Sequence, residues 1–212
     1  MLESVAKDDR WGRYSIFGVE PSRVIQIDEG DLTDPFAALA EACRPWTKRV
    51  VADVPFYGGW IGYFAYEAGR FLEPSAGWTH ERTGLPLAWW GFYDNLLIAD
   101  HLRDEWRVAG LVTPDADDVE SRVRLWEEGI AESAHCGAAK EWHGITEGDW
   151  NDSTEYYQAK VQGVIDFIRA GDVFQVNLAR RYRARCDVSA VQLYQRLCEA
   201  NPACYSALLQ GD

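Results

Sequence analysis

Short apolar runs, separated by turn-forming residues, dominate the first half of the chain. Runs rich in aromatic and β-branched residues between Gly, Pro and Asp are typical of strands. The turn at Glu20-Pro21-Ser22 separates the first two runs, and the polar stretch 101–105 joins the last two as a hairpin. The predicted strands lie at residues 14–18, 24–27, 56–66, 96–100 and 106–112.

Four segments carry apolar residues at helical spacing. In the first, Asp34 stands at the N-cap position and Pro35 at the first helical position. The second is rich in carboxylates and predicts an acidic, solvent-facing helix. The third begins with Asp152 as N-cap and Glu155 three residues later, and it stops at Gly171. The predicted helices span residues 34–43, 115–132, 152–171 and 187–201.

The last third of the chain also contains two predicted strands, at 173–182 and 205–209. In the first, alternation places Phe174 and Val176 on one face and Gln175 on the other. Many short strands with a few amphipathic helices indicate the α+β class. Residues 136–150 lack clear periodicity and are interpreted as a linker. It joins an N-terminal domain at 1–135 to a second, incomplete domain at 151–212.

Composition narrows the possible partners of the chain. Its 212 residues include 21 Lys and Arg against 34 Asp and Glu, which gives a formal charge of −13. This charge disfavours a broad phosphate-binding surface, so we expect no nucleic acid partner. The nearly uncharged stretch 54–66 is too short to cross a bilayer. Charges follow soon after Met1, so we expect no signal peptide, no membrane partner and a cytoplasmic protein.

No generic catalytic or metal-binding signature is present. The five cysteines form no CxxC pair and the four histidines no HxxxH pair, which favours reduced thiols over a metal site. Gly58, Gly59 and Gly62 are reminiscent of a phosphate cradle, but no lysine or capping Ser or Thr follows them. We therefore assign no catalytic residue and no metal ligand in this chain.

Four longer motifs, in order along the chain, together resemble one family. They are Leu2-Glu3-Ser4 with Arg13-Tyr14-Ser15, the segment 54–63 (VPFYGGWIGY), the segment 168–178 (IRAGDVFQVNL) and the segment 201–205 (NPACY). This combination resembles component I of the chorismate-utilising synthases, aminodeoxychorismate synthase and anthranilate synthase. The resemblance implies two antiparallel sheets packed as a sandwich with outer helices, and residues 151–212 as the start of the chorismate-binding domain.

The resemblance also implies a reaction. Ammonia from a glutamine amidotransferase subunit would replace the hydroxyl of chorismate, and Mg²⁺ would bind the substrate carboxylate. In the family the Mg²⁺ ligands and catalytic groups follow the NPxPY motif, whereas this chain ends seven residues after Tyr205. We therefore expect an N-terminal fragment that is truncated at both ends and inactive alone.

The segment 175–178 (QVNL) favours the aminodeoxychorismate branch, which makes 4-amino-4-deoxychorismate for 4-aminobenzoate and folate synthesis. Two alternatives stay open. One is component I of anthranilate synthase, in tryptophan synthesis. The other is a non-catalytic module that binds tryptophan or docks a subunit.

Finally, the resemblance implies a pocket for free L-tryptophan where the first and last motifs meet. Hydroxyl and backbone groups would hold the amino-acid ends, and apolar side chains with a tyrosine would enclose the indole. Cys204 replaces the family's second proline. Alternatively, Tyr205 is an ordinary strand residue and Ser4 belongs to a frayed terminus. The expected tryptophan-binding residues are Leu2, Ser4, Arg13, Cys204 and Tyr205.

Overall fold

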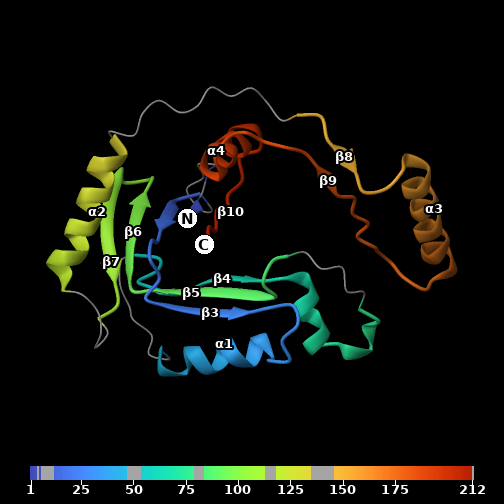
Figure 1. Ribbon diagram of the computed structural model, residues 1–212, viewed down its shortest axis with the longest axis horizontal. Helices are drawn as coiled ribbons and strands as arrows, with labels where there is room; N and C mark the ends of the chain where they lie inside the picture. The colour runs from blue at the N-terminus through green and yellow to red at the C-terminus, as the bar shows by residue number, and fades with distance from the viewer. Residues whose placement is uncertain are drawn as a thin grey trace. The chain divides into compact units, whose positions relative to one another are not determined.

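The computed structural model contains two compact units (Figure 1). The first unit comprises residues 1–137 and 194–212, and the second comprises residues 138–193. Most of the expected linker falls outside the described residues, and its boundaries stay a prediction. The structure describes residues 1–3, 5, 12–46, 54–78, 84–112, 118–134 and 146–211.

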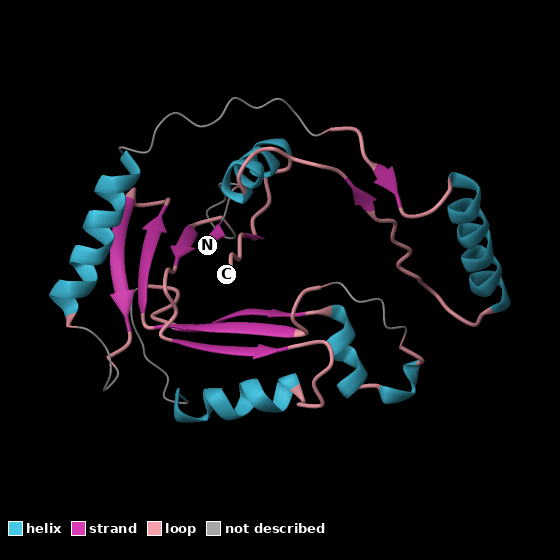
Figure 2. Cartoon of the chain, viewed as in Figure 1, coloured by secondary structure: helices cyan, strands magenta, loops and turns pink. Residues whose placement is uncertain are grey.

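Two antiparallel sheets form the first unit (Figure 2). The larger has the strand order β10-β1-β2-β6-β7 and the smaller the order β3-β5-β4. The larger contains β1 (Leu2–Glu3), β2 (Tyr14–Phe17), β6 (Asn95–Asp100), β7 (Glu105–Gly110) and β10 (Ser206–Ala207). The smaller contains β3 (Arg23–Ile27), β4 (Gly59–Phe64) and β5 (Ala88–Tyr93).

Helix α1 (Pro35–Cys43) covers one face of the smaller sheet. Asp34 caps it as predicted, because its carboxylate accepts hydrogen bonds from the backbone N–H groups of residues 36 and 37. Phe36 packs against Phe64 of β4 with ring centroids 4.5 Å apart. Three short 3₁₀ helices complete this region: η1 (Arg44–Trp46), η2 (Tyr66–Phe71) and η3 (Pro74–Ala76).

The other face of the smaller sheet meets the larger sheet. Ile61 of β4 and Tyr93 of β5 pack against Leu96 and Ile98 of β6, which are almost fully buried. Apolar side chains from two facing sheets therefore share one core, as in a sandwich. This arrangement, with helices outside it, confirms the predicted α+β class.

Helix α2 (Val119–Ala134) packs against β7, and the side chains of Arg122 and Trp126 are buried. The Arg122 guanidinium donates hydrogen bonds to the backbone carbonyls of Asp94 and Leu111, at 2.8 and 2.9 Å. The Trp126 indole N–H donates to the Asn95 side chain at 3.1 Å. The helix is amphipathic as predicted, and its arginine acts as a structural donor.

The second unit contains helix α3 (Thr154–Ala170) and a short antiparallel pair of strands, β8 (Asp149–Trp150) and β9 (Tyr182–Arg183), which precede and follow that helix in the sequence. Arg180 holds it together, because its guanidinium pairs with Asp152 at 2.7 Å. The same guanidinium lies over the rings of Trp150 and Tyr157, at 4.5 and 5.0 Å from their centroids. Helix α4 (Ala190–Ala200) spans the boundary between the units in sequence, and its residues from Tyr194 on belong to the first unit.

Two details of this unit differ from the prediction. Ser153, not Asp152, caps α3, since its hydroxyl accepts the N–H of Tyr156 while Asp152 pairs with Arg180. Residues 173–181 form no strand: their one backbone–backbone contact among the described residues is at Arg181, whose carbonyl accepts the Asn151 N–H, and Phe174 is 94% exposed. Gly171 ends α3 as predicted, with a left-handed φ of 84°.

Candidate functional site

The pairing of β1 with β10 brings the first and last motifs of the sequence together. Leu2 lies opposite Ala207, and Glu3 lies opposite Ser206. The Met1 amino group donates to the Leu208 carbonyl at 2.8 Å, and the Leu208 N–H returns a hydrogen bond to the Met1 carbonyl at 2.9 Å. Segments some two hundred positions apart in sequence are therefore neighbours in one sheet.

Three of the expected tryptophan-binding residues lie on or beside this strand pair. Leu2 is half-buried in β1, where it also faces Ile16 of β2. Cys204 is half-buried, and Tyr205, directly before β10, is 73% exposed. Ser4 lies outside the described residues, so the expected approach of Ser4 to Tyr205 stays a prediction.

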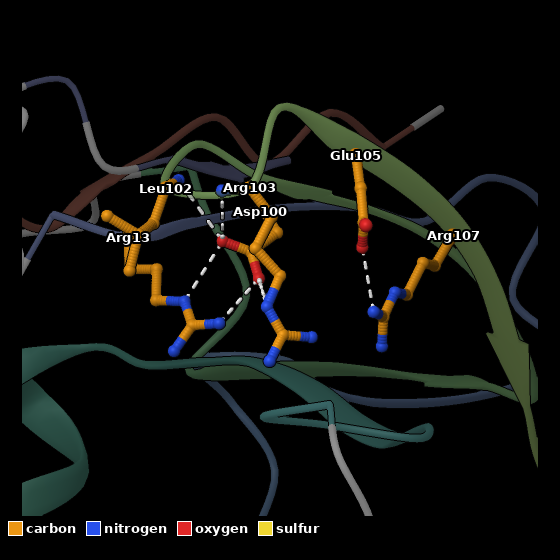
Figure 3. Close-up of polar contacts among 6 residues, drawn as sticks. All are labelled: Arg13, Asp100, Leu102, Arg103, Glu105 and Arg107. Carbon is orange, nitrogen blue, oxygen red and sulfur yellow. Dashed lines mark hydrogen bonds and ion pairs between the residues drawn. The ribbon is translucent and has the colours of Figure 1, made fainter.

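Arg13, the fifth expected residue, makes a bidentate ion pair with Asp100 at the end of β6 (Figure 3). Its Nε lies 2.9 Å from one carboxylate oxygen, and a terminal nitrogen lies 2.7 Å from the other. The Asp100 carboxylate also accepts the backbone N–H groups of Leu102 and Arg103. Arg13 thus anchors β2 to the β6–β7 turn.

This environment favours the ionised form of Asp100. The hydrogen bond from Arg13 is the largest cause, opposed by burial, and it lowers the pKa of Asp100 to about 2. The neighbouring pair of Glu105 and Arg107, at 2.8 Å, lies at the same end of the sheet and is more exposed to solvent (Figure 3). The cluster is a set of paired structural charges.

A second cluster lies around Tyr194 of α4, within the first unit. Tyr194 is the buried residue of α4 and is 8% exposed. Burial raises the pKa of Tyr194, and the nearby Cys198 thiol and Glu3 carboxylate raise it further. The phenol is therefore neutral and lies close to a residue of β1.

An open cavity of about 360 Å³ lies beside the β1–β10 pair. The rings of Trp89 and Tyr93, from β5, contribute to one wall, and Leu208 and Leu209 contribute to another. Burial raises the pKa of Tyr93, which keeps its hydroxyl neutral. The remaining lining residues are Met1, Gly18, Val19, Glu20, Pro21, Gln210 and Gly211.

The turn that closes one side of this cavity depends on close backbone packing. A Cβ at Gly18 would meet the Tyr93 ring at 2.6 Å, so only glycine fits there. Glu20 adopts a left-handed φ of 48°, which is uncommon for a side chain of this size. The predicted strands did not include β5, so the sequence analysis did not anticipate this wall.

The described residues contain no group of three or more His, Cys, Asp or Glu side chains that could hold a metal ion. Within the same residues, no helix is both long enough and apolar enough to cross a membrane. The described part of the site region therefore offers a strand pair, a cavity lined in part by Trp89 and Tyr93, and paired charges, and we identify no acid–base constellation in it.

A family model described as "chorismate binding enzyme" matches residues 3–212. Anthranilate synthase component 1 from Thermus thermophilus is 32% identical over 99% of this chain and 47% of its own length. Aminodeoxychorismate synthase component 1 from Bacillus subtilis is 25% identical over 99% of this chain and 47% of its own length. The chain thus spans about half the length of these curated relatives.

Among solved structures, anthranilate synthase component I from Streptococcus pneumoniae TIGR4 has a similar fold. The TM-score is 0.70 at 22% identity, and the match covers 90% of this chain and 46% of that chain. It supports the arrangement of sheets and helices described above.

Proposed function

Because the chain belongs to the chorismate binding enzyme family, we propose that it forms part of a component I that aminates chorismate. The observation that carries this proposal is the family match, which extends over residues 3–212. The ammonia would come from a glutamine amidotransferase partner. The free cysteines at 43, 186, 198 and 204 are compatible with a cytoplasmic setting.

We propose 4-amino-4-deoxychorismate as the product, on the basis of Gln175, Val176, Asn177 and Leu178. Anthranilate is the second candidate, and the name of the Thermus thermophilus relative favours it. In either case the ammonia replaces a hydroxyl of chorismate in the first step. Further elimination of pyruvate and aromatisation would lead to anthranilate.

Mg²⁺ is proposed as the cofactor of the complete enzyme, where it would bind the substrate carboxylate and assist departure of the hydroxyl. The residues described here do not fit this ion, since no group of three or more His, Cys, Asp or Glu side chains among them could hold a metal. We therefore derive no catalytic step from this chain's own side chains.

The test begins with the gene. The coding sequence on both sides of codons 1–212 is read, and the complete reading frame is expressed. The purified protein is incubated with chorismate, ammonium and Mg²⁺, and the products are separated by chromatography. Formation of 4-amino-4-deoxychorismate supports the first candidate, anthranilate supports the second, and a lack of amination contradicts both.

We also propose that the β1–β10 region binds L-tryptophan. Support comes from the pairing of the two motifs, from half-buried Leu2 and from the exposed ring of Tyr205. An exposed tyrosine beside apolar strand residues offers a ring on which an indole can pack. The Arg13 guanidinium is paired with Asp100, so its proposed role is to hold β2 in position beside the tryptophan site.

A further inference from the structure

We draw no further inference here: the strongest candidate, the open cavity that Trp89, Tyr93 and Leu208 help to line beside the β1–β10 strand pair, belongs to the site already described.

Discussion

Asp100 is buried at the end of β6, where its carboxylate binds Arg13 and the backbone N–H groups of Leu102 and Arg103. Its folded-state pKa of about 2 is below the ordinary value of 3.8, so folding favours the ionised form. This contribution to stability is fully present above about pH 4 and is lost as the pH falls toward 2.

Asp100→Asn should therefore lower the free energy of unfolding by about 1–3 kcal/mol at pH 7, the range for hydrogen bonds to charged groups. Urea denaturation of both proteins between pH 7 and 2.5 measures the difference, which should shrink at the acid end. Glu105→Gln serves as control, because that more exposed pair should contribute less than about 1 kcal/mol. A pH-independent difference between Asp100→Asn and the parent would contradict this role.

Tyr205 provides the residue-scale test of tryptophan binding. Tyr205→Ala should weaken L-tryptophan binding about tenfold, because the ring that packs on the indole is removed, whereas Tyr205→Phe should retain most of the affinity. Isothermal titration calorimetry gives both values. Tyr66→Ala, at a tyrosine 85% exposed in η2, should leave binding unchanged. Equal L-tryptophan affinity of the parent and of Tyr205→Ala would show that Tyr205 is not part of the binding site.

Gly62 of β4 illustrates a residue whose importance the sequence does reveal. Its place in a glycine-rich strand predicts close backbone approach or a bulge, and a Cβ there would collide with the backbone of Trp89 and Trp90. We expect Gly62→Ala to cost about 1–3 kcal/mol, as for overpacked positions. Gly30→Ala, where no atom lies within 4 Å, should be close to neutral in the same thermal melts.

At the scale of elements, Arg180 organises the second unit. It joins the β8–β9 strand pair to the start of α3 through Asp152, Trp150 and Tyr157. Arg180→Met should destabilise this unit by about 3 kcal/mol, because it leaves the Asp152 carboxylate largely buried and unpaired. Arg180→Lys keeps the charge and should cost less.

Hydrogen exchange at the Asn151 amide, which donates to the Arg181 carbonyl beside the β8–β9 strand pair, reports on this pair directly. Faster exchange in Arg180→Met than in Arg180→Lys is the expected order. Unchanged exchange in both variants would show that the strand pair and α3 are held together by other contacts.

Several elements were predictable because their signals are local. The Asp34-Pro35 start of α1, the Gly171 end of α3 and the β6–β7 hairpin all follow from neighbouring residues. β5 was missed because its sequence, Ala88–Tyr93, contains no charged or strongly polar residue and therefore does not alternate. The prediction of a strand at 173–182 failed because alternation identifies a candidate strand but cannot supply its partner.

The candidate site was predictable only through the family resemblance. Nothing local to Leu2 or Tyr205 indicates that they are neighbours, since the β1–β10 pairing depends on contacts more than two hundred positions apart. Arg13 was expected beside a ligand. Its pairing with Asp100 depends on a residue 87 positions away, so it could not be read from its own surroundings.

For the molecule as a whole, we expect the 212-residue chain to form no aminated product from chorismate, ammonium and Mg²⁺. The physical reason is that we identify no acid, base or metal-binding constellation within the described residues. Chromatography of the reaction mixture provides the measurement, with an active chorismate-aminating enzyme as positive control. Any 4-amino-4-deoxychorismate or anthranilate above the enzyme-free level would contradict the expectation.

The Met1–Leu208 contact also has a consequence for biosynthesis. A ribosome adds roughly 5–20 residues per second, so β1 emerges roughly 10–40 s before β10 can leave the exit tunnel. During that interval, the described residues of β1 can pair in this sheet with β2 alone, at the Leu2–Ile16 position. The nascent chain therefore carries an unfinished sheet throughout this interval, and it is then that chaperones would have this surface to protect.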